Sequence, residues 1–230
     1  MVALDKTTGK TVWKTDRSTK FGDIDGDFRK AFCTPIVIGS GPQRQLVSPG
    51  SKAAMAYDLH TGRELWKIHF DGFSSTARPL AADGLVFLFT GFGKSALWAV
   101  RPDGQGDVTE SHVLWNAEDG LPDTCSPLVT SQCLLLLSSE GILTSYDVKS
   151  GKKLWEQDFE SSFKASPSLV GKNVYLLGDE GKAWIVEPGP AACKTVAQAD
   201  VGEHCTASPA FQDGRIYLRG KEHLFCIGNK

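Results

Sequence analysis

An internal repeat constrains the fold of this chain more than any other feature of its sequence. Residues 56–66 read AYDLHTGRELW and residues 145–155 read SYDVKSGKKLW, and residues 3–13, ALDKTTGKTVW, give a third close copy. Residues 98–115 form a looser copy with a longer turn. The copies end at tryptophans that lie 53, 49 and 40 residues apart: Trp13, Trp66, Trp115 and Trp155. A unit of this length predicts an array of similar supersecondary elements.

A second marker, a small residue and a polar residue followed by proline, falls between the copies. Its prolines are spaced by 44, 48, 40 and 42 residues: Pro35, Pro79, Pro127, Pro167 and Pro209. Short segments rich in Leu, Val, Phe and Tyr, such as LVFLFTG and NVYLLGDEG, run between the markers and end at glycine or a polar turn. These intervals match roughly 40–50 residues for one propeller blade. We therefore predict an all-β chain, a β-propeller of four-stranded antiparallel blades.

The invariant letters of the repeat have structural explanations. Asp58 and Asp147 should close the third strand of a blade, where a carboxylate accepts backbone N–H groups and starts a turn. Gly62 and Gly151 can adopt the positive φ that leads through a bulge into the next strand. The tryptophan should lie on the outermost strand and bury roughly 200 Å² against the neighbouring blade. That burial is worth several kcal/mol at about 25 cal/mol per Å².

The pattern A-x-D-x-x-[ST]-G-[KR]-x-x-W resembles the repeat of quinoprotein-type β-propellers, the PQQ-like repeat, and is similar to that of the outer-membrane assembly lipoproteins of this family. The resemblance covers nearly the whole chain. It implies a ring of seven or eight blades and a periplasmic or cell-envelope location. The fifth unit departs from the pattern, because Ala197 stands near the place of the tryptophan. We expect weaker packing there against the next blade.

The repeat divides the chain into about five blade units within a single β-propeller domain or propeller fragment. The boundaries that we predict are a partial blade at 1–20, blades at 33–70, 77–119, 125–160 and 165–202, and a partial blade at 207–230. Segment 10–16 could complete the last partial blade and close a five-bladed ring. We favour the alternative, a fragment of a seven- or eight-bladed ring.

Composition excludes some partners and locations. Lys and Arg number 25 against 27 acidic residues, so no basic excess attracts nucleic acid. No apolar stretch reaches 18 residues, and the first ten residues have neither the basic start nor the apolar run of a signal peptide. The six cysteines form no CxxC motif, and we expect most of them to be buried thiols.

Polar residues beside the proline markers are candidates for a binding site. In extended chain, small residues and polar residues there would face opposite ways. If the segments enter the innermost strands, the polar residues would surround one mouth of the central channel: Thr34, Arg78, Ser126, Lys164, Ser166 and Ser208. Arg78 and Lys164 would let this site hold a small molecule with a carboxylate or phosphate. The alternative is that the hydroxyls only make local hydrogen bonds at strand starts.

Two further motifs lie in turns. Asp23, Asp25 and Asp27 have the alternate spacing of calcium loops, but Phe28 and Thr34 stand where an EF-hand needs glycine and glutamate. We favour a turn whose carboxylates cap backbone donors. The segment GFGKS at 91–95 lacks the first glycine of a phosphate loop and has no helix after it, so we expect a turn there too.

Two functions follow from these observations. The first is a non-catalytic scaffold that binds protein partners or a ligand, since no constellation for nucleophilic catalysis is present in the sequence. The alternative, from the resemblance, is an oxidoreductase that binds pyrroloquinoline quinone and calcium, with its catalytic residues in missing blades. Enzymes of this family use an adjacent pair of cysteines, and this sequence has none. We therefore lean toward the scaffold.

Overall fold

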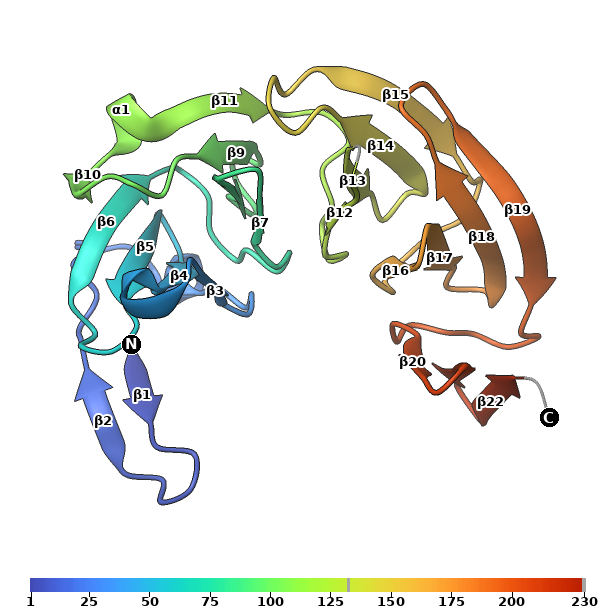
Figure 1. The fold of residues 1–230 in the computed structure, drawn as a ribbon, viewed down its shortest axis with the longest axis horizontal. Coiled ribbons are helices and arrows are strands. Elements are labelled where there is room, and N and C mark those ends of the chain that lie inside the picture. Colours follow the sequence, from blue (N-terminus) through green and yellow to red (C-terminus); the bar gives the residue numbers. More distant parts are fainter. Residues whose placement is uncertain (132, 229–230) are drawn as a thin grey trace. The chain divides into compact units, whose positions relative to one another are not determined.

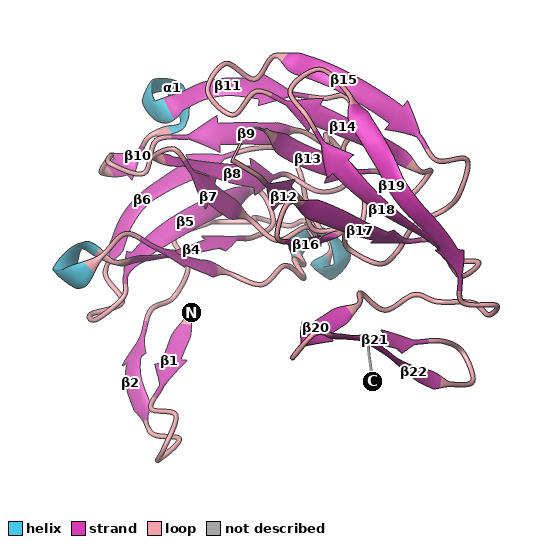
Figure 2. Ribbon diagram, turned by 45° about the vertical axis from the view of Figure 1, so that its right-hand side comes forward, coloured by secondary structure: helices cyan, strands magenta, loops and turns pink. Residues whose placement is uncertain are grey.

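A computed structural model of the chain describes residues 1–131 and 133–228. The chain divides into two compact units, Met1–Glu118 and Asp119–Lys230. Each unit is built almost wholly from antiparallel sheets, and the helical segments are short pieces in the connections (Figure 2). They are η1 (Gly26–Arg29), η2 (Gly41–Gln43) and α1 (Thr109–His112). The last two residues of the predicted partial blade 207–230 lie outside the described residues.

The first unit holds a hairpin and two blades (Figure 1). The hairpin consists of β1 (Val2–Leu4) and β2 (Thr11–Lys14). The next blade consists of β3 (Ile36–Ile38), β4 (Gln45–Pro49), β5 (Ala53–Asp58) and β6 (Glu64–His69). The blade after it consists of β7 (Leu80–Ala82), β8 (Leu85–Phe89), β9 (Leu97–Val100) and β11 (Val113–Ala117). In both blades the strands are paired in chain order, and the tryptophan strand is the last of the four.

The second unit holds two blades and a three-stranded sheet (Figure 1). Its first blade consists of β12 (Leu128–Val129), β13 (Leu134–Leu137), β14 (Ile142–Tyr146) and β15 (Lys153–Asp158). Its second consists of β16 (Ser168–Val170), β17 (Asn173–Leu177), β18 (Lys182–Pro188) and β19 (Cys193–Asp200). The three-stranded sheet consists of β20 (Ala210–Gln212), β21 (Arg215–Arg219) and β22 (Leu224–Gly228). The predicted four-stranded antiparallel blades are thus confirmed.

The repeated aspartate organises the turn between the last two strands of each close copy. Asp58 Oδ1 accepts hydrogen bonds from the backbone N–H and hydroxyl of Thr61, at 2.8 and 2.9 Å. The N–H of Gly62 donates to the Asp58 carbonyl at 2.9 Å, and Gly62 has a φ of 72°. The strand register then shifts between Ala56 and Tyr57. Asp5 and Asp147 make the same turn, which confirms the interpretation of the repeat.

The tryptophan of the first hairpin packs on the glycine of the next copy. A Cβ built on Gly62 would lie 2.4 Å from the Trp13 ring, so only glycine lets the indole approach this closely. The indole N–H of Trp13 donates to the carbonyl of Leu59, in the same turn, at 3.0 Å. Trp155 likewise donates to the Gly189 carbonyl, in the turn between β18 and β19, at 2.9 Å. The repeated tryptophan and glycine therefore meet between neighbouring blades at Trp13 and Gly62.

Strand register shows which residues are equivalent from blade to blade. Each repeat tryptophan faces a small residue on the preceding strand, in the pairs Trp13–Ala3, Trp66–Ala56, Trp115–Ala99 and Trp155–Ser145. In the fifth copy, Ala197 takes the tryptophan position and faces Ile185. In this copy the large residue, Ile185, is on the third strand and the small residue, Ala197, is on the fourth.

The core of each unit lies between its blades. In the first unit, Trp66 and Ile68 of β6 are fully buried and pack in one cluster with Val86 and Leu88 of β8. In the second unit, residues of β13 and β17 share a cluster with Trp184. Because consecutive blades share apolar clusters, no blade buries its apolar face alone.

The longer turn of the loose copy adds a strand that the sequence did not predict. β10 (Gly106–Asp107) leaves the β9–β11 connection and pairs in parallel with β6, opposite Trp66 and Lys67. Val108, which follows it, is buried in the cluster around Trp66. The insertion therefore covers the outer edge of the preceding blade, where an unpaired strand would otherwise be exposed.

The six cysteines carry free thiols, and three are buried: Cys125, Cys133 and Cys205. Burial raises the pKa of the Cys125 thiol to about 11, and burial likewise raises that of Cys193 to about 11. Both thiols stay protonated at neutral pH and pack as apolar groups.

The contact between Trp13 and Gly62 can be measured with a matched pair of glycine variants. Gly9 has the same turn and nearly the same φ, 69°, with open space around its Cβ position. We expect Gly9→Ala to cost about 1–2 kcal/mol of unfolding free energy from backbone strain alone. Gly62→Ala should cost about 1–3 kcal/mol more, because its methyl group meets the indole. Urea unfolding measures both.

A double-mutant cycle supplies the control. In a Trp13→Ala background the extra cost of Gly62→Ala should disappear. An extra cost that persists without the indole would contradict the predicted contact.

The aspartate turns predict a pH dependence with a definite sign. Hydrogen bonds from the Thr61 backbone and hydroxyl lower the pKa of Asp58 in the folded state. The stabilisation is therefore fully present above the ordinary carboxyl range, and is lost as the pH falls through the lowered pKa. We expect the melting temperature difference between the unmodified protein and Asp58→Ala to shrink between pH 5 and pH 3. A constant difference over that range would contradict this expectation.

Candidate functional site

The predicted channel residues are divided between the two units. Thr34 and Arg78 belong to the first unit and are exposed. Ser126, Lys164, Ser166 and Ser208 belong to the second. A ring made by all six residues stays a prediction, whereas the contacts within the second unit can be described.

The three serines of the second unit form a ladder across its sheets. The backbone N–H of Ser126 donates to Ser166 Oγ at 2.8 Å, and the N–H of Ser166 donates to Ser208 Oγ at 2.9 Å. The Cys125 thiol donates to the carbonyl of Ala165 at 3.4 Å in the same direction. The serine hydroxyls thus join the start of each blade to the start of the blade before it.

Lys164 is paired with a buried carboxylate. Its Nζ lies 3.5 Å from Asp179 Oδ2, and the Asp179 side chain is only 7% exposed. The Ser162 hydroxyl donates to the same oxygen at 3.1 Å, and Asp179 Oδ1 has no hydrogen-bond partner among the described residues. The Asp179 carbonyl also accepts the N–H of Cys205 at 2.8 Å. Lys164 therefore neutralises a buried charge at the junction of two sheets.

Two of the aspartates that the sequence offered as calcium ligands make local contacts instead. Asp25 Oδ1 accepts the N–H of Asp27 at 2.8 Å as the cap of η1, and Asp27 pairs with Lys30. Among residues 1–131 and 133–228, no group of three His, Cys, Asp or Glu side chains is placed to hold a metal ion. Asp25 and Asp27 thus make contacts within their own turn, and the segment GFGKS at 91–95 lies in the connection between β8 and β9.

Exposed phenylalanines stand out on the first unit. Phe28, Phe32 and Phe92 are 46%, 64% and 53% exposed. Phe28 and Phe32 come from the connection between β2 and β3, and Phe92 comes from the β8–β9 turn. We call these three residues the aromatic surface. All three are linked to the same short segment of the chain, and apolar side chains gathered in one exposed region mark interaction sites more often than single ones do.

The segment 73–75 holds the aromatic surface together. The Phe28 ring lies edge-on to the ring of Phe73, with centroids 4.9 Å apart. Phe73 and Phe92 exchange two backbone hydrogen bonds, at 3.0 and 2.8 Å. The N–H of Phe32 donates to the Ser75 carbonyl at 2.8 Å. Two motifs that are far apart in the sequence thereby meet on one short segment.

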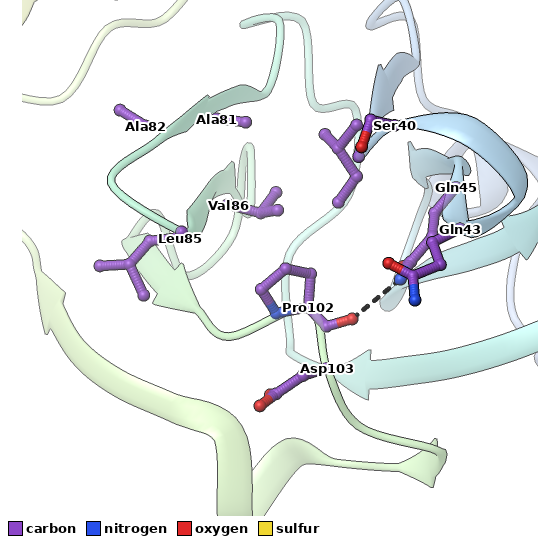
Figure 3. A pocket seen from close by; sticks show the side chains of 12 residues that line it. Ser40, Gln43, Gln45, Ala81, Ala82, Leu85, Val86, Pro102 and Asp103 are labelled. Carbon is purple, nitrogen blue, oxygen red and sulfur yellow. Dashed lines mark hydrogen bonds between the residues drawn. The ribbon is translucent and has the colours of Figure 1, made fainter.

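A cleft of about 650 Å³ lies between the β3–β4 and β7–β8 hairpins of the first unit (Figure 3). Its polar groups are used internally. Gln45 accepts the indole N–H of Trp66 at 2.8 Å and donates to the Pro102 carbonyl at 3.1 Å. Asp103 lies 3.5 Å from the ring of His112. Gln45 thus links the Trp66 indole to the turn of the next blade. Trp13 and Trp155 bond to a carbonyl of the corresponding turn directly.

The sequence analysis considered both segments of the aromatic surface but singled out other residues in them. It selected the aspartates at 23, 25 and 27, whose spacing suggested calcium, rather than Phe28 and Phe32. Two phenylalanines within a polar turn were the available signal. Asp179 was missed because its burial depends on the sheet that follows it.

The fold and its repeated turns define a β-propeller protein of PQQ-like repeats. Residues 1–181 match the model of the family described as outer membrane protein assembly factor BamB, and the chain belongs to this family. The family resemblance and the β-propeller class predicted from the sequence are confirmed.

Two relatives illustrate the match. The outer membrane protein assembly factor BamB of Yersinia pestis is 26% identical over 270 residues, an alignment that covers 96% of this chain and 67% of the relative. The crystal structure of BamB from Moraxella catarrhalis superposes with a TM-score of 0.69 at 16% identity, covering 98% of this chain and 65% of that one. This second likeness shows the fold alone. The chain spans about two thirds of the length of both relatives.

The Lys164–Asp179 pair yields a stability prediction. Lys164→Met leaves a buried carboxylate with one hydrogen-bond donor, so we expect a loss of about 1 kcal/mol or more in unfolding free energy. Lys172→Met is the matched control, since Lys172 makes an exposed pair with Glu187 at 3.0 Å and should change stability by less than about 0.5 kcal/mol. Adding Asp179→Asn to Lys164→Met should recover part of the loss. Equal effects of Lys164→Met and Lys172→Met in urea unfolding would contradict the assigned role.

Proposed function

We propose that the protein is a non-catalytic scaffold that takes part in outer membrane protein assembly and acts in the cell envelope through protein partners. The aromatic surface is the observation that carries this proposal. Its three phenylalanines are exposed, backbone hydrogen bonds tie Phe32 and Phe92 to segment 73–75, and the Phe28 ring packs on the ring of Phe73. Aromatic side chains that are both exposed and fixed lose little conformational freedom on binding. Membership in a family of assembly factors supports the same conclusion.

The polar residues of the second unit support a structural role for the blade junctions. The serine ladder and the Lys164–Asp179 pair connect one sheet to the next. Their donors and acceptors are used within the chain, which favours a rigid frame over a small-molecule site. These contacts therefore do not support the prediction that the six channel residues form one ligand site.

The alternative, an oxidoreductase with pyrroloquinoline quinone and calcium, has less support. The relatives described above are assembly factors by name. Asp25 and Asp27, two of the three aspartates that suggested calcium, cap and pair within their own turn. No helix within residues 1–131 and 133–228 has the length and apolarity needed to cross a membrane. We place the scaffold in the cell envelope on the basis of its family.

The aromatic surface predicts where partners are captured. A photo-crosslinking amino acid placed at Phe32 in cells should form a stoichiometric adduct with an envelope protein, identified by mass spectrometry. Phe28→Ser with Phe92→Ser should reduce this adduct by about tenfold or more, because a hot-spot aromatic is worth about 2 kcal/mol or more.

The control uses exposed residues of the same unit outside the aromatic surface. Val12 and Leu114 are 61% and 50% exposed, and Val12→Ser with Leu114→Ser should leave the adduct at Phe32 unchanged. Melting temperatures verify that each variant is folded. An adduct that is absent in the unmodified protein, or equally reduced by the control pair, would contradict the proposed function.

A further inference from the structure

The fifth copy of the repeat leaves an apolar cavity in the second unit. Ala197 occupies the position that holds tryptophan in the four other copies, as the strand register shows. The cavity has a volume of about 450 Å³, and its lining residues belong to the blade β16–β19, the sheet β20–β22 and the connection between them. This volume is within the range of about 300–1,000 Å³ that is typical of ligand sites.

The floor and the mouth of the cavity differ in exposure. Leu177 and Leu218 are nearly fully buried, pack in one apolar cluster and form its floor. Ala197 and Ile227 are exposed and stand at the mouth. The Ile185 side chain, opposite Ala197, belongs to the lining and does not close the cavity. A side chain from outside can therefore enter the space.

The lining favours a flat aromatic group. Tyr175 and Phe225 contribute rings to it, and aromatic pairs in offset or edge-on contact gain about 0.5–1.5 kcal/mol beyond burial. Asp200 is the only charged residue among the described residues of the lining. Its Oδ1 accepts the backbone N–H of Gly202 at 2.8 Å, and its negative charge disfavours a fatty acid or a phosphate relative to a neutral ligand such as an indole.

We propose that this cavity binds the indole side chain of a tryptophan presented by a protein partner. The partner would supply in trans the group that the other copies supply in cis. The indoles of Trp13, Trp66 and Trp155 pack against the neighbouring blade, and Trp13 and Trp155 donate their N–H to a carbonyl there. This inference rests on the proposed scaffold function and adds the chemistry of one partner contact.

The test fills the cavity from within. N-acetyl-L-tryptophanamide is the probe, and its binding is followed by saturation-transfer NMR. We expect saturable binding to the unmodified protein and about tenfold weaker binding of N-acetyl-L-leucinamide. Ala197→Trp should reduce the binding of the tryptophan probe by about tenfold or more and raise the melting temperature, since it restores the packing of the other copies.

A matched variant and a smaller substitution keep the test decisive. Thr195 lies on β19 outside the cavity lining, so Thr195→Trp should leave binding unchanged. Where Ala197→Trp lowers the melting temperature, Ala197→Phe is used in its place. Unsaturable binding to the unmodified protein, or equal binding by the filled variant, would overturn the inference.

The source of the indole is decided in cells. A crosslinking amino acid at Ala199, in the lining, should capture a protein partner, and Ala197→Trp should abolish that adduct. An extended segment that pairs only with the edge of β22 would be unaffected by Ala197→Trp, and that result would overturn the inference. Loss of the Ala199 adduct alone, with the Phe32 adduct intact, would leave the proposed function standing.

Discussion

The structure depends on one contact, between the tryptophan of a blade and the turn of the next. Trp13 packs on Gly62 and donates to Leu59, and Trp155 donates to Gly189. A fully buried tryptophan such as Trp66 contributes about 5 kcal/mol of apolar burial at about 25 cal/mol per Å². The turn can receive the indole because aspartate holds its shape and glycine leaves the space. Aspartate, glycine and tryptophan thus meet in one contact at Trp13 and the turn of Asp58 and Gly62, whereas the Trp155 indole makes its carbonyl bond to a turn without the aspartate.

Variation on this contact accounts for the local features of the molecule. In the first full blade Gln45 relays the tryptophan bond to Pro102, and an insertion adds β10 to the outer edge. In the fifth copy the large and small partners are exchanged, and a cavity results. The serine ladder joins the inner ends of the sheets in the second unit. The frame thus tolerates change at single positions while neighbouring blades stay connected.

Much of the fold could be predicted because it repeats. A motif written three times at blade-length intervals averages out the ambiguity of any single strand, and four strands per blade follow from the spacing of the markers. The position of Ala197 was also predictable, since a missing letter is visible against its copies. The aromatic surface was not, because Phe28, Phe32 and Phe92 occur in segments that do not repeat. Their proximity depends on backbone hydrogen bonds from Phe32 and Phe92 to residues 73–75, and on the contact between the Phe28 and Phe73 rings.

The sequence by itself determined the architecture, the turns and the family, since all three rest on local patterns and their periodicity. The tertiary structure alone decided which polar residues are used within the frame and which side chains face solvent. In the sequence Lys164 is a candidate for binding a ligand, whereas in the structure it pairs with the buried Asp179, fifteen residues later. Such pairings join residues through space, and the free energy of burying a charge depends on everything that surrounds it.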